Sequence, residues 1–308
     1  MAKILGILPH SIGGRLTTSS ILDGFKQNGF KVVLFDELKD ENFLNDDYSF
    51  IVGYDFSPIK FKIENNLNIK TIAYFSDEID KKTAGEGYLK YQKYLKNKDI
   101  FAFYWDRELS KKENLFYQPH FVNTKIYKNF KKPIYDVMFM GRLDTSLRLK
   151  MYLDLNKKLP NLKFCWHAIE KHYLDALSRT ENEEEKDILK NTYQGFIDNE
   201  NDMASAINNT KIVYNINAQG KSSLNYRTIQ TMASQRLLIT DERAELDLFE
   251  NILPVYQTTE DLIEKIKYYL GNDEEYEKIT KKSREFIELN HDSAKCVLNM
   301  LNLISKIN

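Results

Sequence analysis

The sequence predicts two consecutive α/β domains, each built on a doubly wound parallel β-sheet. Short apolar runs alternate with helical patterns along the chain, and one polar, lysine-rich segment, 123–133, interrupts the alternation. The 308 residues are enough for two domains, which typically run to ~100–200 residues each. Strands that alternate with helices form βαβ units with right-handed crossovers, so each half is expected to be Rossmann-like.

In the first half, each apolar run of four to six residues is followed by a polar loop or a helical pattern. The predicted strands cover 4–8, 31–35, 50–54, 70–75 and 100–104. Between the first two strands we expect a polar loop that contains Gly13 and Gly14, and then a helix from about 18 to 28. A second, short helix is expected to end near residue 66.

The second half repeats this alternation and ends in helices. The predicted strands cover 135–140, 162–166, 212–216, 237–240 and 252–256. The predicted helices cover 146–157, 203–208, 226–234, 261–270, 273–289 and 293–307. The charge run 181–186 is typical of a solvated loop or helix face.

Composition excludes several classes of function. The 44 Lys and Arg nearly balance the 45 Asp and Glu, so no global field favours nucleic acid or an anionic membrane. No apolar stretch is long enough for a stable membrane insertion, and no signal-peptide core is expected. Cys165 and Cys296 are not spaced as metal ligands or as a redox dithiol. A chain with only two cysteines fits a reducing, cytoplasmic location.

An anion site is expected where the second half carries glycine and hydroxyl residues before a helix. Residues 219–225 read QGKSSLN and precede the helix predicted to begin at 226. Backbone N–H groups and the dipole at a helix N-terminus attract anions. Arg227 lies in the first turn of that helix and can reach a phosphate bidentately. The alternative is that Arg227 forms a structural ion pair.

Several segments resemble one protein family when they are taken in order. Residues 226–241, YRTIQTMASQRLLITD, resemble the R-x-x-E-x-x-A-x-G-x-x-(L/I)-(L/I)-T-D segment of the CgeB-like (spore-maturation type) glycosyltransferases, in the two-domain class GT-B. Residues 117–127, 136–142, 193–197 and 212–217 agree with this family in order and spacing. The resemblance covers most of the second half and the first half loosely.

The resemblance implies transfer of a sugar from a nucleotide-sugar donor, with a UDP-sugar favoured and no further cofactor, to a hydroxyl of a glycan or another acceptor. It implies an acceptor-side domain over 1–130 and a donor domain over 131–292, which face each other across a cleft. A final helix, 293–308, is expected to pack back on the first domain. The role would lie in bacterial glycan or glycoconjugate synthesis.

Donor contacts are expected from turn and strand-end residues. The expected donor-binding residues are Gly13, Gly14, Arg142, Gly195, Phe196, Asn217, Ser223, Leu224, Asn225, Arg227 and Gln230. Arg142 is the preferred cation for the leaving diphosphate, while Arg148 and Lys150 are the alternatives or form an exposed helix face.

Two departures from the family pattern bear on stereochemistry. Gln230 stands where the family has a glutamate, and Ser222 stands where many GT-B enzymes carry a second one. Both departures favour inversion of configuration, which needs a general base. His10 and Asp77 follow predicted strands and are the candidate bases, with His120 as a third choice. A structural role is the alternative for His10 and Asp77, and contact with the donor sugar or shaping of the cleft is the alternative for His120.

Missing motifs narrow the remaining alternatives. No D-x-D, P-loop, G-x-G-x-x-G or G-x-S-x-G pattern occurs, so metal-independent transfer is expected and no metal site is assigned. Two other functions stay open. One is a sugar-nucleotide epimerase or hydrolase on the same scaffold, and the other is a non-catalytic nucleotide-sugar binding protein.

Overall fold

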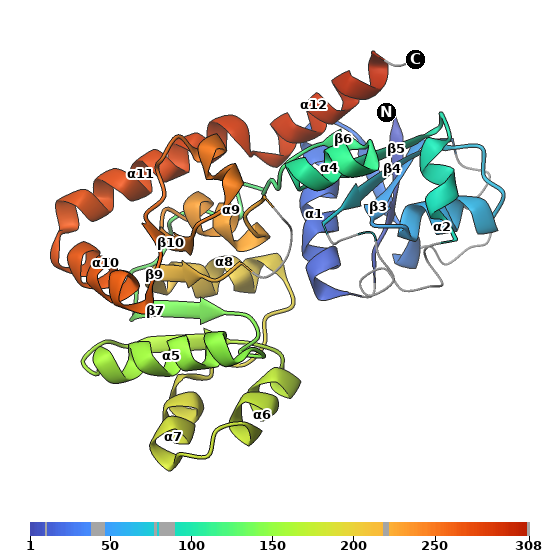
Figure 1. Cartoon of the computed structure of the whole chain (residues 1–308). Coiled ribbons are helices and arrows are strands. Elements are labelled where there is room, and N and C mark those ends of the chain that lie inside the picture. The colour runs from blue at the N-terminus through green and yellow to red at the C-terminus, as the bar shows by residue number, and fades with distance from the viewer. Residues whose placement is uncertain (10, 38–46, 77–78, 80–89, 218–221, 307–308) are drawn as a thin grey trace. The chain divides into compact units, whose positions relative to one another are not determined.

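The structure is a computed structural model that describes residues 1–9, 11–37, 47–76, 79, 90–217 and 222–306 (Figure 1). The chain forms two compact units. The first comprises Met1–Asn123, Gln219–Asn225 and Leu289–Asn308, and the second comprises Thr124–Ala218 and Tyr226–Glu288. The first unit therefore contains the N-terminal part of the chain, its C-terminal segment and the short segment that follows residue 218.

A six-stranded parallel sheet in the order β2-β1-β3-β4-β5-β6 forms the centre of the first unit. Its strands are β1 (Lys3–Ile7), β2 (Lys31–Leu34), β3 (Tyr48–Tyr54), β4 (Lys70–Phe75), β5 (Ile100–Tyr104) and β6 (Phe116–Tyr117). Because β2 and β3 lie on opposite sides of β1, the chain winds both ways from β1. The sheet is therefore doubly wound.

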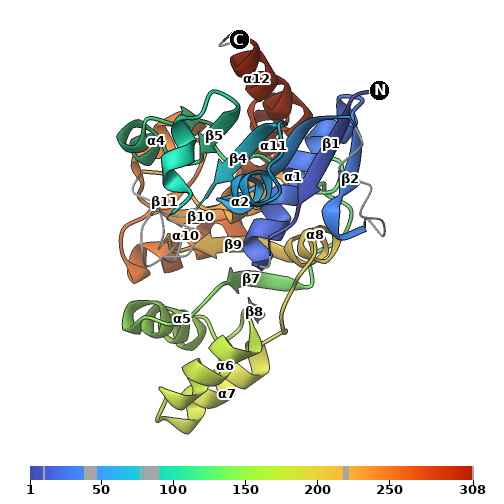
Figure 2. The ribbon, with the colours of Figure 1, turned by 90° about the vertical axis from the view of Figure 1, so that its right-hand side faces the viewer.

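Helices bury both faces of this sheet. They are α1 (Ile12–Gln27), α2 (Ser57–Glu64), α4 (Arg107–Glu113) and α12 (Ser293–Ser305), and α12 lies beside α1 (Figures 1 and 2). The close approach depends on Gly24, where an added Cβ would lie 2.5 Å from the Ser293 carbonyl oxygen. Apolar residues of α12, among them Val297 and Met300, complete the core of this unit.

The second unit has a five-stranded parallel sheet in the order β11-β10-β9-β7-β8. Its strands are β7 (Tyr135–Met140), β8 (Phe164–His167), β9 (Thr210–Asn215), β10 (Leu237–Asp241) and β11 (Val255–Tyr256). Since β8 and β9 lie on opposite sides of β7, the strand order reverses between β7 and β9. In open α/β sheets, ligands bind outside the carboxyl ends of the strands at such a switch point.

The helices of the second unit, except α9, begin at side-chain caps or with acidic first turns. They are α5 (Ser146–Lys158), α6 (Glu170–Ser178), α7 (Glu183–Thr192), α8 (Glu200–Asn208), α9 (Tyr226–Ala233), α10 (Thr259–Gly271) and α11 (Asp273–Asn290). Thr145 and Asn182 accept hydrogen bonds from the backbone of α5 and α7, and α7 begins with three glutamates. Such caps and acidic first turns stabilise helix N-termini.

The predicted fold class is confirmed: the chain has two parallel α/β units of Rossmann-like type. One local expectation is wrong. Gly13 and Gly14 belong to the first turn of α1 rather than to a loop. The helix can begin there because residue 14 has no side chain: an added Cβ would lie 2.7 Å from Pro9 Cγ and 2.8 Å from Tyr54 Cδ1.

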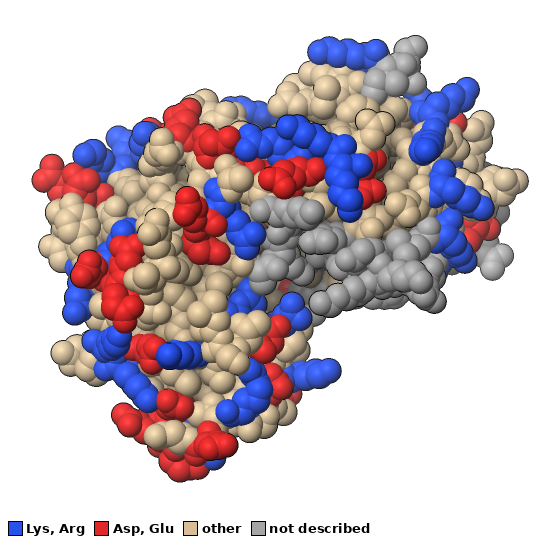
Figure 3. All heavy atoms as spheres, viewed as in Figure 1, with Lys and Arg blue, Asp and Glu red and all other residues tan. Residues whose placement is uncertain are grey.

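The structure also shows how charge and hydropathy are distributed. On the face drawn in Figure 3, basic and acidic side chains are interspersed rather than separated. Among the described residues, no helix is both long and apolar enough to cross a bilayer.

Candidate functional site

Arg227 lies in the first turn of α9, and its surroundings do not balance its charge. The residue is half-buried, and its Nε atom is sealed from solvent without a hydrogen-bond partner among the described residues. Burial, and secondarily the charge of Arg148, lower the pKa of Arg227 to about 10. No ion pair joins Arg227 to a carboxylate in the part of the chain that the structure describes.

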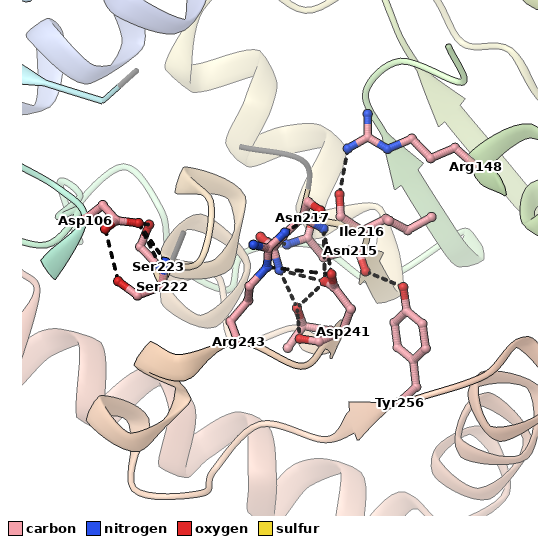
Figure 4. Close-up of polar contacts among 11 residues, drawn as sticks. Asp106, Arg148, Asn215, Ile216, Asn217, Ser222, Ser223, Asp241, Arg243 and Tyr256 are labelled. Carbon is pink, nitrogen blue, oxygen red and sulfur yellow. Dashed lines mark hydrogen bonds and ion pairs between the residues drawn. The ribbon is translucent and has the colours of Figure 1, made fainter. Parts of the chain in front are cut away.

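Arg148 is held in place by the backbone at the ends of two strands. It lies in the first turn of α5, where its N–H donates to the Thr145 hydroxyl. Its guanidinium donates to the carbonyl of Ile216, 2.8 Å away (Figure 4), and to that of Arg142, 3.3 Å away. The side chain is 11% exposed. Since Ile216 follows β9 and Arg142 follows β7, Arg148 spans the switch point of the sheet.

Positive charge exceeds negative charge at this point. Asp144 pairs with Arg142 at 3.3 Å and with Arg148 at 3.4 Å, so one carboxylate serves two guanidiniums. Arg227 adds a third positive charge. The helix dipoles of α5 and α9 add partial positive charge at their N-termini. This arrangement favours an anionic ligand.

A polar network fixes the backbone that leaves β9 (Figure 4). The Asp241 carboxylate accepts from the backbone N–H of Asn217 at 3.0 Å and from its side-chain amide at 2.6 Å. Arg243 donates to the Asn217 carbonyl at 2.6 Å, and the Tyr256 hydroxyl donates to the Asn215 carbonyl at 2.8 Å. The Asn217 amide, expected at the donor, is thus hydrogen-bonded inside the protein.

Gly141 places its backbone next to Arg227. It has a φ of +136°, a conformation that L side chains rarely adopt. An added Cβ would lie 3.9 Å from Arg227 Nη1. The Trp166 indole N–H donates to the Gly141 carbonyl at 2.8 Å, and the Gly141 N–H donates to the His167 carbonyl at 2.9 Å. The turn after β7 is therefore fixed against the end of β8.

His167, which sequence reasoning did not select, ends β8 next to this turn. Its Nδ1 atom is buried without a hydrogen-bond partner among the described residues. Burial lowers the pKa of His167, the Gly195 backbone opposes this, and the charge of Arg227 lowers it further. The available signal was a polar residue at the end of the apolar run FCWH.

Gly195 and Phe196 lie in the segment after α7. Gly195 has a φ of +83°, and its carbonyl accepts from the Ala168 N–H at 3.2 Å. Phe196 is 43% exposed. An exposed aromatic ring beside a strand end offers a flat apolar surface to a ligand.

The segment that contains Ser222 and Ser223 belongs to the first unit and is bound there by Asp106. The Asp106 carboxylate, which is fully buried, accepts from both backbone N–H groups and both hydroxyls at 2.9–3.2 Å (Figure 4). The donors expected to bind phosphate at Ser223 thus go to a carboxylate of the chain. Leu224 is buried, and Asn225 is half-buried.

The remaining predicted residues are Gln230, Arg142 and the two candidate bases. Gln230 is buried in α9 and donates to the Tyr127 hydroxyl at 2.7 Å. Arg142 is exposed and pairs with Asp144. The two candidate bases, His10 and Asp77, lie outside the described residues.

Two further expectations concern His120 and metals. His120 is buried in the first unit, with Nδ1 3.3 Å from the Tyr74 hydroxyl. Within the described ranges, no group of three or more His, Cys, Asp or Glu side chains is arranged to hold a metal ion.

Two parallel α/β units in succession are the architecture of the GT-B glycosyltransferases, and comparison with solved structures shows the same fold. Sucrose-phosphate synthase from Thermosynechococcus elongatus matches with a TM-score of 0.69 and 12% identity, over 100% of this chain and 99% of that chain. HepE of Anabaena, solved in complex with UDP, matches with a TM-score of 0.68 and 10% identity, over 99% and 100%. A glycosyltransferase from Rickettsia africae matches with a TM-score of 0.63 and 12% identity, over 99% and 98%.

The sequence comparison supports the same class. Residues 152–302 match the family model described as glycosyl transferase-like. This segment contains most of the second unit, including His167 and Arg227. No curated protein is similar enough in sequence to count as a relative of the chain.

Proposed function

We propose that the protein is a glycosyltransferase that moves a sugar from a nucleotide-sugar donor to an acceptor hydroxyl. The observation that carries the proposal is the excess positive charge at the switch point of the second sheet, where Arg148 and Arg227 lie with Asp144 as their nearby carboxylate. The glycosyl transferase-like match over 152–302 and the UDP complex of HepE support the same assignment.

The proposed chemistry follows from the charge of the leaving group. The acceptor oxygen attacks the anomeric carbon, and the bond from that carbon to the β-phosphate oxygen breaks. The electron pair leaves with the nucleoside diphosphate, so negative charge grows on the β-phosphate. In this proposal Arg227 and Arg148 stabilise that charge, because fixed cations act strongly where water is partly excluded.

We propose further that transfer needs no metal and inverts configuration at the anomeric carbon. The absence of a D-x-D sequence and the presence of Gln230 where the family has a glutamate support these two points. A CgeB-like subfamily, a UDP-sugar donor and a glycan acceptor in bacterial synthesis belong to the same proposal. Asp77 or His10 would take the acceptor proton, and comparing turnover of Asp77→Asn with that of His10→Ala distinguishes them.

Calorimetry and product analysis test the assignment. Wild-type protein is titrated with UDP, GDP and ADP, and is then incubated with the sugar nucleotide of the diphosphate that binds and with a panel of acceptors. We expect one diphosphate to bind, transfer to continue in EDTA, and NMR to show inverted configuration in the product. Failure of all three diphosphates to bind would refute the assignment, whereas release of free sugar without a glycoside would indicate a hydrolase.

A further inference from the structure

Asp106 holds the chain segment that leads into α9. Its buried carboxylate accepts from the backbone N–H groups of Ser222 and Ser223 at 2.9 and 3.2 Å, and from their hydroxyls at 3.1 and 3.2 Å (Figure 4). The same carboxylate caps α4 by accepting from the Leu109 N–H at 2.9 Å, and the Glu108 N–H donates to the Ser222 hydroxyl at 3.3 Å. Both serines are therefore fixed to the first turn of a helix of the first unit.

The chain on either side of these serines belongs to the candidate site. Before them, the chain leaves β9 through Ile216, whose carbonyl binds Arg148 at 2.8 Å. After them, it enters the second unit at Tyr226 and reaches Arg227, four residues after Ser223. The anchor in the first unit is thus separated from Arg227 by a short stretch of backbone.

Helix α9 is short, and its two ends are held in different ways. It has eight residues, and a helix of that length is not stable without tertiary contacts. Towards its C-terminal end, the Gln230 amide donates to the Tyr127 hydroxyl at 2.7 Å, and the Arg284 guanidinium donates to the Ala233 carbonyl. Arg227 lies in the opposite turn, and its Nε has no hydrogen-bond partner among the described residues. The position of its guanidinium therefore depends on where the backbone enters the helix.

We propose that Asp106 is a positioning residue for donor binding. Through Ser222 and Ser223 it fixes the backbone that enters α9, and this fixed backbone presents Arg227 to the phosphates of the donor. Asp106 does not touch the donor itself, because it is fully buried and both of its carboxylate oxygens accept hydrogen bonds within the protein. The inference rests on the proposed function and extends it to a residue outside the donor site.

The physical basis of the effect is preorganisation. A site whose backbone is already ordered binds more tightly, because the entropic cost of ordering it does not fall on the binding step. Without the carboxylate, the segment before α9 loses its anchor and has to become ordered when the nucleotide binds. Removal of Asp106 should therefore weaken binding even though the cationic side chains of the site are all present.

Calorimetry with Asp106 variants tests the inference. The ligand is UDP, GDP or ADP, whichever the wild type binds, and the temperature is one at which circular dichroism shows every variant to be folded. Asp106→Ala should bind about 5–30-fold more weakly with unchanged stoichiometry, a factor that corresponds to ordering one backbone residue on binding. Asp106→Asn keeps one acceptor oxygen and should lose less affinity.

A double-mutant cycle with Arg227→Ala separates positioning from a general loss of structure. If Asp106 acts through Arg227, Asp106→Ala should weaken binding much less in the Arg227→Ala background than in the wild type, because the two substitutions remove the same interaction. Asp106→Asn takes its place in the cycle if the alanine variant does not fold.

Asp292→Ala is the matched control. Asp292 belongs to the same unit and accepts from the Ala294 N–H at the start of α12, but its segment does not lead to α9. This variant should keep its affinity for the nucleotide. The inference is overturned if the Asp106 variants keep full affinity, if Asp292→Ala weakens binding as much, or if the effects of the Asp106 and Arg227 substitutions simply add. Absence of any nucleoside-diphosphate binding by wild type would instead refute the proposed function.

Discussion

Asp106 in the first unit and Arg227 in the second are two charged side chains with opposite surroundings. Asp106 is fully buried, and its carboxylate accepts four hydrogen bonds from Ser222 and Ser223 and one from the Leu109 N–H that begins α4. Arg227 is half-buried, has Nε without a partner among the described residues, and has Arg148 as a like-charged neighbour.

The difference separates a charge that stabilises the fold from one that is available to a ligand. A buried carboxylate is tolerated when hydrogen bonds replace its hydration. A guanidinium without such compensation weakens the free protein, and an anion that binds to it restores the balance. Residues with strongly shifted pKa values beside a specific charge are, for the same reason, candidates for functional sites.

The largest effect is expected at Asp106. Replacement of Asp106 by Ala leaves five buried donors without their acceptor, and we expect a loss of about 3–5 kcal/mol in the free energy of unfolding, the range for breaking a buried charged network. Urea denaturation of the full chain measures it. Asp106→Asn keeps one acceptor oxygen and should lose less. A loss below about 1 kcal/mol in the Ala variant would mean that Asp106 is not the anchor of Ser222 and Ser223.

For Arg227 we expect a large effect on ligand binding and no loss of stability. Arg227→Ala is expected to weaken nucleoside-diphosphate binding by about 1.5–3 kcal/mol, the range for a hydrogen bond to a charged group. The free energy of unfolding should stay the same or rise, because the variant removes an uncompensated charge. Calorimetry and urea denaturation on the same preparations measure the two quantities.

Arg236 provides the matched control for that experiment. It is also buried, and its Nε is likewise without a partner among the described residues, but its Nη2 donates to the carbonyls of Lys131 and Asn208, so its charge is partly compensated within the protein. Arg236→Ala should therefore lose stability and keep its affinity for the nucleotide. If both variants lose stability and neither loses affinity, Arg227 is a structural residue.

The sequence predicts elements that depend on local contacts better than features that depend on contacts between residues far apart in the chain. The strands over 70–75, 100–104 and 135–140 were predicted at their observed bounds, because apolar runs between polar segments are a local signal. Helix α4 was not predicted. Its start depends on Asp106 as a cap, and the sequence offers no apolar periodicity over its seven residues.

The candidate site was only partly visible in the sequence. Arg227 was selected from its place in the first turn of a predicted helix, and the structure puts it beside Arg148, which the sequence left between a phosphate contact and an exposed helix face. The engagement of Ser223 by Asp106 joins residues 117 positions apart, and no local pattern indicates it. His167 became evident only when the neighbouring ends of β7 and β8 placed it next to Gly141.

The smallest effect is expected at His120, a titratable side chain that is buried in its neutral form. In the first unit, burial and, secondarily, the charge of the neighbouring His291 lower the pKa of His120 to about 3, so His120 is neutral in the folded protein at pH 7. In the unfolded chain its pKa returns to about 6.5. The unfolded state therefore binds more protons below that pH, and stability is full above about pH 6.5 and falls as the pH decreases.

Because protonation of His120 is coupled to unfolding, His120 should lower the free energy of unfolding by about 1 kcal/mol between pH 7 and pH 5.5. Urea denaturation of the wild type at both pH values, compared with His120→Gln, measures it. The glutamine keeps hydrogen-bonding groups near Tyr74 but does not titrate, so the variant should lose less stability on acidification, whatever its stability at pH 7. An equal decrease in the two proteins would show that His120 is protonated in the folded state or that other groups account for the acid sensitivity. Burial of His120 would then have to be compensated by a partner for its charge, as it is for Asp106.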